Sequence, residues 1–370
     1  MSTTKRILSV DIFRGLTIAA MILVNNPGTW GQVYAPFLHA EWHGLTPTDL
    51  IFPFFLFIVG MSISFAYTKK KVIGINVDVY KKIVSRTLKL IFLGLFLAAF
   101  TFDFPFIKDF SHLRLPGVLQ RIGVVFFIAS ILFLHLNWKA LLGIFVAILI
   151  GYWLIMTQIS VNGTMALLTK ESNFASVVDL NILTRAHMWK ELYDPEGLLS
   201  TIPAIATTIF GMFLGMILLK KNKSQQEKLK LFIIIGVMAL VLGYLWSVIF
   251  PLNKALWTSS FVLVTGGWAT LIYAAIFYIA DILGHASWGK PAIIFGSNAI
   301  TVFFLSSFTA KSFGLVKLSS GQSLHGFLYE TLSSIITIPK LSSLIYAVFV
   351  IVFYYLVAYI LYRKKIFIKV

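Results

Sequence analysis

The chain has 370 residues, of which 58% are hydrophobic and only 12% are charged, and it contains no cysteine. Soluble domains carry about 25% charged residues, so this composition excludes an ordinary soluble protein and indicates a polytopic membrane protein. The missing cysteines exclude disulfides, thiolate metal sites and a cysteine nucleophile. The formal net charge of +17 is typical of nucleic-acid binding, but the basic residues lie between apolar runs. Positive-inside topology therefore explains them better, and no nucleic-acid partner is predicted.

The apolar runs predict one all-α domain over residues 1–370 that crosses the lipid bilayer about ten times. The predicted spans are 8–26, 49–67, 84–101, 116–136, 139–157, 200–219, 229–250, 257–280, 291–312 and 343–362. Basic residues gather on one side of these spans, which predicts that both termini are cytoplasmic. The outward loops are then 27–48, 158–199 and 313–342. Lys5 and Arg6 precede the first run, but no small-residue cleavage site follows, so we expect an uncleaved first helix.

The first predicted helix carries polar groups on one face. Asp11 lies three residues before Arg14, where the two can pair. Arg14 and Asn25 lie within about 20° of each other around the helix and roughly 16 Å apart along it. Ionisable groups in a membrane span are costly and typical of functional sites. The face predicts a polar path between the two membrane surfaces. The alternative is a buried Asp11–Arg14 pair that only orients the helix.

The loop that follows holds two histidines among aromatic residues, His39 and His43, with Trp42 between them. A histidine here can act as a general base or as a transient acyl acceptor. The alternative is an interfacial histidine within an aromatic belt, and spacing alone does not separate His39 from His43. Asp49 begins the second span, where it either orients an imidazole or caps the helix.

Further polar residues occur at the ends of later spans. Arg114, Gln120 and Arg121 lie around the start of the fourth span, where an arginine either binds an anionic group or carbonyl, or snorkels to the interface. Asp194 and Glu196 lie in a turn of loop 158–199, which we expect to form an ordered lid or substrate wall.

Polar residues also open the eighth span, and one lies within the ninth. Lys254, Trp257 and Ser260 lie at the start of the eighth span, and Asn298 lies within the ninth. Such residues bind substrate or hold membrane helices together. Gly211 and Gly215 form a GxxxG pair that serves either a dimer or an internal helix contact. The sequence has no GxxxxGK[ST] phosphate loop, no HExxH and no GxSxG, and we predict no metal site.

Six collinear segments resemble one family. They are SVDIFRGLTIAAMILVNNPG, FLHAEWHGLTPTDLIFPFFLFIVGMSI, RLPGVLQRIG, YDPEGLLSTI, NKALWTSSFVL and FGSNAITVF. Together they resemble heparan-α-glucosaminide N-acetyltransferase. Relative to the lysosomal form, the chain is expected to lack the large lumenal domain and the extra leading helix. The resemblance implies a compact bacterial-type enzyme, a multi-pass protein of the inner membrane.

The resemblance implies transfer of an acetyl group from cytoplasmic acetyl-CoA, as co-substrate, to the amine of a glucosamine-type sugar on the periplasmic side. It makes His39, the histidine of the HAxWxG motif, the catalytic residue, with Asn25 of the preceding VN assisting. Arg14, Arg114, Arg121 and Glu196 also fall on motif positions. Asp11, Trp42, Asp49 and the polar residues of the later spans complete the predicted substrate site.

Two mechanisms and several functions stay open. His39 either takes the proton of the attacking amine or carries the acetyl group itself. Basic residues of the inner loops are candidates for binding the CoA phosphates, with positive-inside topology as the alternative explanation: Lys69–Lys71, Lys81, Lys82 and Arg86. The rival functions are an amino-sugar transporter, an acyltransferase with another acceptor, and a non-enzymatic membrane scaffold.

Overall fold

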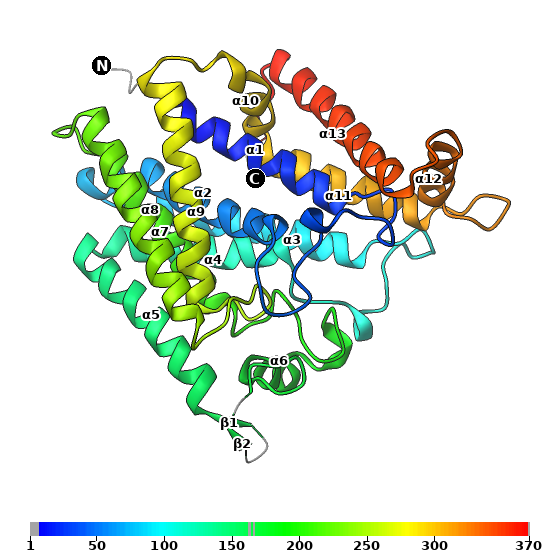
Figure 1. The fold of residues 1–370 in the computed structure, drawn as a ribbon, viewed down its shortest axis with the longest axis horizontal. Coiled ribbons are helices and arrows are strands. Elements are labelled where there is room, and N and C mark those ends of the chain that lie inside the picture. Colours follow the sequence, from blue (N-terminus) through cyan, green and yellow to red (C-terminus); the bar gives the residue numbers. More distant parts are fainter. Residues whose placement is uncertain (1–6, 162–163, 166, 369–370) are drawn as a thin grey trace.

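The computed structural model describes residues 7–161, 164–165 and 167–368, and it is built of helices, which confirms the all-α class (Figure 1). Lys5 and Arg6 lie outside the described residues. The helices are α1 (Leu8–Asn25), α2 (Pro47–Ile73), α3 (Val77–Ala99), α4 (Val118–His135), α5 (Trp138–Gln158), α6 (Phe174–Leu183), α7 (Thr201–Leu219), α8 (Gln225–Ser247), α9 (Ser259–Phe277), α10 (Lys290–Ser297), α11 (Ala299–Leu315), α12 (Leu324–Ile335) and α13 (Pro339–Arg363). Two short strands, β1 (Ser160–Val161) and β2 (Thr164–Met165), pair antiparallel.

Eight helices of the described chain are long and apolar enough to cross a membrane, as expected of a polytopic protein: α1, α2, α4, α5, α7, α8, α9 with its π-helical extension to Ile282, and α13. The predicted span 84–101 falls in α3, which is not among them. This helix carries Lys81, Lys82, Arg86 and Lys89, so only the stretch after residue 89 is apolar throughout.

The prediction of one continuous span over 291–312 is wrong. Helices α10 and α11 meet at an angle of 69°, and Asn298 separates them. Counted as one broken span, this pair raises the number of candidate spans to nine. Its bend has a physical support, because the amide of Asn298 bonds to backbone outside the helix. Asn298 Nδ2 donates to Ile366 O (3.0 Å), and Ile368 N donates to Asn298 Oδ1 (2.9 Å).

The three predicted loops carry helical structure of their own. Loop 27–48 holds one 3₁₀ turn (Ala35–Phe37), loop 158–199 holds α6, and loop 313–342 holds α12. In Figure 1, α12 packs beside α13 at the edge of the molecule far from the connection between α7 and α8. The assignment of these loops to the outer face stays a prediction.

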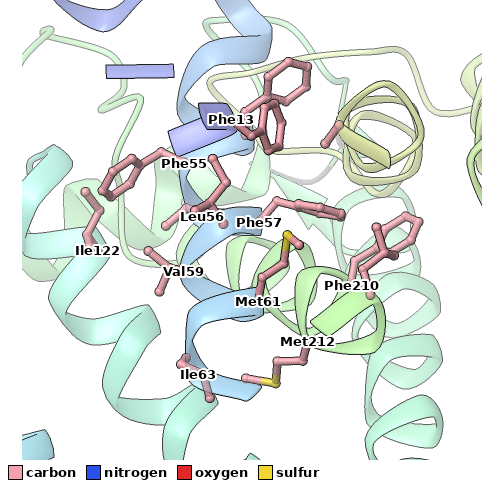
Figure 2. Packing of buried hydrophobic residues seen from close by; sticks show 14 of the residues in the cluster. Phe13, Phe55, Leu56, Phe57, Val59, Met61, Ile63, Ile122, Phe210 and Met212 are labelled. Atoms are coloured by element: carbon pink, nitrogen blue, oxygen red, sulfur yellow. The ribbon is translucent and has the colours of Figure 1, made fainter. Parts of the chain in front are cut away.

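Helices α2 and α7 form the centre of the bundle. In each of these two helices, 72% of the 18-residue apolar stretch is buried inside the protein. The buried share of the same stretch is 22% in α8 and 17% in α13. Figure 2 shows Val59 of α2 directed toward Ile122 of α4, while Phe57 and Met61 face α7. Side chains on opposite faces of α2 therefore pack against other helices of the protein. The peripheral helices α8 and α13 are the ones expected to contact lipid.

Small residues let α2 and α7 approach closely. A Cβ atom added at Gly60 would lie 1.9 Å from Thr208 O, and one added at Gly211 would lie 1.9 Å from Phe57 O. Gly215 faces Met61 and Ser64 of the same partner helix. The GxxxG pair therefore serves an internal contact, in which glycine replaces the side chain that would hold the backbones apart.

Candidate active site

The first polar cluster joins the loop before α2 to the start of that helix. His39 Nδ1 lies 2.7 Å from Asp49 Oδ1. Asp49 is 1% exposed in its side chain, whereas His39 is 48% exposed. A carboxylate only accepts, so in the neutral imidazole Nδ1 carries the hydrogen and Nε2 keeps its lone pair. The exposed ring is thus held by a buried acid and presents a basic nitrogen.

Asp49 performs both of the roles that the sequence left open. Its second oxygen, Oδ2, accepts from Thr46 N (3.0 Å) and Thr46 Oγ1 (3.0 Å), which forms the capping box of α2. The same oxygen accepts from Ala40 N (3.1 Å), the residue after His39. One carboxylate therefore begins the helix, holds the loop backbone and orients the imidazole.

A lysine from the connection between α8 and α9 completes this cluster. Lys254 Nζ lies 3.1 Å from Nδ1 and 3.0 Å from Nε2 of His39. A position in the ring plane at these distances would collide with Cε1, so the ammonium lies over the ring face. Gly44 N donates to Leu252 O (2.8 Å), which ties the two loops together. Gly44 has a φ of +126°, a conformation that glycine adopts without strain. Loss of hydration lowers the pKa of Lys254.

The second histidine has a different environment. His43 lies beside Asn253, whose Nδ2 is 3.4 Å from His43 Nδ1. Burial lowers the pKa of His43. The neighbouring Trp42 donates from Nε1 to Leu168 O (2.7 Å) and packs edge-on against Tyr193. These side chains join loop 27–48 to loop 158–199, whereas His39 is the histidine held by a carboxylate.

A second cluster is formed by Arg114 and two acids. Its guanidinium donates from Nε to Asp194 Oδ2 (2.9 Å) and from Nη2 to Asp194 Oδ1 (2.6 Å) and Glu196 Oε2 (2.6 Å). Burial alone disfavours this cation, but the two carboxylates reverse the effect and raise the pKa of Arg114. The predicted turn is present, since Gly197 N donates to Asp194 O (3.0 Å).

Arg121 lies deeper, on α4, and is 2% exposed. Its Nη2 donates to Gly197 O (3.0 Å) and to Ser200 Oγ, and its guanidinium lies over the ring of Trp257 (5.2 Å). Its Nε and Nη1 are buried, and no hydrogen-bond partner for them is present among the described residues. Arg121 therefore supports the turn beneath Glu196 rather than snorkelling to an interface.

Two predicted site residues are buried and form hydrogen bonds within the protein. Trp257 is fully buried and donates from Nε1 to Thr207 Oγ1 (3.0 Å). Ser260 is equally buried, and its hydroxyl donates to Phe250 O. Both side chains shape the connection that carries Lys254.

One acid in loop 158–199 was not predicted as a site residue. Asp179 of α6 is 2% exposed, and its Oδ1 accepts from Leu198 N (2.8 Å). Burial, reinforced by Asp194, raises the pKa of Asp179 to about 6. Only its presence in the longest polar loop hinted at a role.

A cavity of about 690 Å³, here called the outer cavity because it lies at the end of α1 that is predicted to face outward, is lined by Asn25, Gln120, Arg114 and Lys311, among others. Asn25 is the exposed last residue of α1. Gln120 Nε2 donates to Leu115 O (3.2 Å) and lies against Gly94. The structure therefore brings Asn25 together with Gln120 and Arg114, and it brings His39 together with Asp49 and Lys254 instead.

An inner cavity of about 1100 Å³ lies at the other end of α1. Arg14 reaches into it, donating from Nη1 to Asp11 (3.2 Å) and from Nη2 to Ser62 Oγ (3.2 Å). The basic residues in its wall are Arg14, Lys70, Lys81, Lys82, Arg86 and Lys89, and Asn298 also lines it. Lys89 was missed, although Lys82, Arg86 and Lys89 fall on one helical face by their spacing.

The predicted polar path along α1 is divided. Arg14 lines the inner cavity and Asn25 lines the outer one, and within the described chain these two cavities share no lining residue. The Asp11–Arg14 pair exists as predicted, and it also stands at a cavity rather than serving only to orient the helix. No group of three or more His, Asp or Glu in the described part of the chain is placed to hold a metal ion.

Comparison with known proteins matches the segments that carry these clusters. The family model described as "Heparan-alpha-glucosaminide N-acetyltransferase, catalytic" matches residues 6–249, more than half of the chain. The human heparan-alpha-glucosaminide N-acetyltransferase is 29% identical over 425 aligned residues, covering 99% of this chain and 60% of that protein. The mouse protein is 27% identical, covering 100% of this chain and 61% of its own length. The chain thus spans about 60% of the length of these curated relatives. It belongs to the heparan-alpha-glucosaminide N-acetyltransferase catalytic family.

Proposed function

We propose that this protein is a transmembrane N-acetyltransferase that moves an acetyl group from acetyl-CoA on the cytoplasmic side to the amine of a glucosamine-type sugar on the outer side. The observation that carries the proposal is the 2.7 Å contact between His39 and Asp49. It lies within the stretch matched by the catalytic family model. A buried acid that orients an exposed imidazole is the arrangement by which enzymes make a histidine a directed base.

The inner cavity supports acetyl-CoA as the donor. Its wall carries six basic side chains and one acid, Asp78, which suits the phosphates of CoA. Arg86 and Lys89 are held on α3, and Arg14 extends the positive surface toward the middle of α1. We infer that these residues bind the nucleotide end of the donor, and that both chain termini lie on this side.

In the first scheme, His39 acts as a general base. Its Nε2 takes a proton from the sugar amine as the nitrogen–carbon bond to the acetyl carbonyl forms. The carbon–sulfur bond then breaks, and the leaving thiolate takes that proton back, which restores the neutral imidazole. Lys254, above the ring, is placed to stabilise the negative oxygen that develops on the acetyl group. Asn25, at the outer cavity, is proposed to contact the acetyl carbonyl or the sugar.

In the second scheme, Nε2 attacks the thioester itself, and the CoA thiolate leaves as the acetyl group bonds to the imidazole. The sugar amine then attacks this acetyl group and the imidazole leaves, while the thiolate takes up the proton that the amine loses. The two schemes predict different labelling. With radiolabelled acetyl-CoA and no acceptor, acid-quenched protein retains label only if His39 is acetylated. Full turnover without retained label supports the ternary complex.

The test uses purified protein in proteoliposomes with labelled acetyl-CoA and glucosamine. We expect His39→Ala to lower acetyl transfer at least about 10²-fold, the typical loss of a general base. His43→Ala is the matched control, in the same loop but without a carboxylate partner in its side-chain contacts, and we expect activity within about threefold of the parent. Parent-like activity in His39→Ala would refute the catalytic assignment.

One observation favours transport as a second candidate. The break between α10 and α11 at Asn298 is the kind of interrupted span in which transporters place their binding sites. Asn298 is, however, bonded to backbone near residues 366 and 368. In the same proteoliposomes, glucosamine uptake without consumption of acetyl-CoA supports the transporter.

A further inference from the structure

An apolar cavity of about 840 Å³ lies beside the outer cavity, between the end of α1 and helices α11, α12 and α13. Aromatic and aliphatic side chains make up most of its wall, among them Trp30, Phe313, Leu328, Tyr346, Phe349 and Phe353. Several of its polar groups are hydrogen-bonded within the protein. Tyr354 Oη, for example, donates to Leu305 O (2.9 Å), and Ser306 Oγ donates to Phe303 O (2.8 Å). The cavity therefore offers hydrocarbon surface.

Two of the helices around this cavity, α12 and α13, are largely unburied within the protein. Only 17% of the 18-residue apolar stretch of α13 is buried inside the protein. Two of its aromatic side chains, Phe349 and Phe353, are 60% and 56% exposed. Helix α12 is amphipathic and has no buried residue, and Ile335 at its end is 77% exposed. A short helix of this kind is typical of the membrane interface. A molecule already in the bilayer can thus reach the cavity from the side.

The apolar cavity adjoins the polar one. Both are lined by Asn25, Asn26 and Ala310. Beyond this junction the wall carries Lys108 and Arg114. Arg114 holds Glu196, whose charge acts on Lys254 beside His39. Two adjoining cavities therefore present hydrocarbon surface next to polar groups that are linked to the proposed base.

This shape and chemistry are complementary to an amphiphile. We propose that the acceptor is a glycolipid: an amino sugar whose hydrocarbon chain occupies the apolar cavity while the sugar occupies the polar one. The inference rests on the proposed function and extends it, since it names the class of molecule that carries the amine.

A glycine provides the means of testing the cavity. Gly314 lies in its wall, and a Cβ atom added there meets nothing within 4 Å. Gly314→Phe therefore fills the cavity without a steric clash at the backbone. Gly143 of α5 is the matched control, because it is also an exposed helical glycine with open space around it and does not line this cavity.

The experiment compares glucosamine with decyl β-glucosaminide in nanodiscs and measures the ratio of their kcat/KM values in each protein. Partition of the decyl chain into the bilayer raises this ratio equally in all three proteins. We expect the parent and Gly143→Phe to share a ratio at least tenfold above that of Gly314→Phe. Equal ratios in the three proteins, or a parent that does not prefer the decyl compound, would overturn the proposal.

A binding measurement separates this inference from the proposed function. A decyl β-glucosaminide with a diazirine on its chain is photolysed with the protein in the absence of acetyl-CoA, and the crosslinks are mapped. Labelling of α12 and α13 that is lost in Gly314→Phe supports the cavity even if no amine is ever acetylated. Acetylation of glucosamine without such labelling supports the proposed acetyltransferase function and refutes the glycolipid acceptor.

Discussion

At the scale of single residues, one carboxylate links the proposed base to the folding of α2. Asp49 uses Oδ1 for His39 and Oδ2 for the backbone at Thr46 and Ala40. The loop that carries the imidazole is therefore held by the same group that starts α2. Such an arrangement limits the motion of an otherwise exposed ring, and a histidine works as a base only when its free nitrogen is directed.

Asp49→Asn tests this link. An amide still accepts at one oxygen and can cap the helix, but it no longer provides a carboxylate that fixes the Nδ1–H form of His39. We expect kcat for acetyl transfer to fall about 10²- to 10⁴-fold, with KM for acetyl-CoA within about twofold of the parent. Thr46→Ser, which keeps a capping hydroxyl, is the control in the same steady-state assay. Parent-like kcat in Asp49→Asn would show that the contact only caps the helix.

Asp179 leads to a pH-dependent prediction. Its folded-state pKa of about 6 lies above the ordinary value of 3.8, so its proton stabilises the fold below about pH 4. This contribution is lost as the pH rises through about 6, and its size is about 3 kcal/mol at most. Asn cannot lose a proton. We therefore expect the melting temperature of Asp179→Asn, relative to the parent, to be higher at pH 8 than at pH 4. A difference independent of pH would contradict the assignment.

At the scale of elements, the bundle depends on close contact between α2 and α7. Their backbones approach at Gly60 and Gly211, where a methyl group would overlap a carbonyl oxygen of the facing helix. This contact matters for the candidate site as well as for the fold, since Asp49 lies in the first turn of α2 and α7 follows the turn that holds Glu196. A shift between the two helices would move both polar clusters.

Gly211→Ala tests the contact. The added methyl group would lie 1.9 Å from Phe57 O, so the helices must separate. We expect a loss of about 1–3 kcal/mol, typical of overpacking, seen as a lower melting temperature and a lower yield of monodisperse protein in detergent. Gly151→Ala on α5 adds the same group where nothing lies within 4 Å, and its melting temperature should match the parent. Equal melting temperatures for both variants would exclude the tight contact.

At the scale of the whole molecule, α1 separates two chemically different cavities. The inner one is basic, and the outer one is bordered by the Arg114 cluster and the apolar cavity. In the proposed reaction a soluble anionic donor enters from one side and the amine approaches from the other. Acetyl transfer across the bundle then takes place near α1, one of the helices that line both cavities.

Charge removal in the inner cavity is the corresponding test. With Lys81, Lys82 and Lys89 all changed to Gln, we expect KM for acetyl-CoA to rise about tenfold at low salt, because three cations facing the phosphates are lost. Added salt should reduce the difference, since exposed charges are screened. The control changes Lys220, Lys221 and Lys223 to Gln, an equal change of charge on the same predicted face but outside the cavity wall. Equal effects of the two triple variants would exclude a specific phosphate site.

Much of the fold was predictable because the information is local. Each span is encoded by its own run of apolar residues, and the cap of α2 lies within four residues of sequence, from Thr46 to Asp49. The resemblance likewise selected His39 over His43 through a six-residue motif. Where local signals were mixed, prediction failed: α3 combines basic and apolar residues, and the break at Asn298 is supported by backbone 68 residues further along the chain.

The sequence by itself therefore determined the membrane class, the helical runs, the family and the candidate histidine, because each depends on the order of residues within one segment. Only the tertiary structure decided which polar residues meet. Lys254 lies 215 residues from His39 and reaches it because the loops before α2 and α9 pack together. Asn25, only 14 residues from His39 along the chain, lies instead at the outer cavity, whose wall does not include His39. Distance along the chain does not set distance in a bundle, since helix packing determines which helix ends lie side by side.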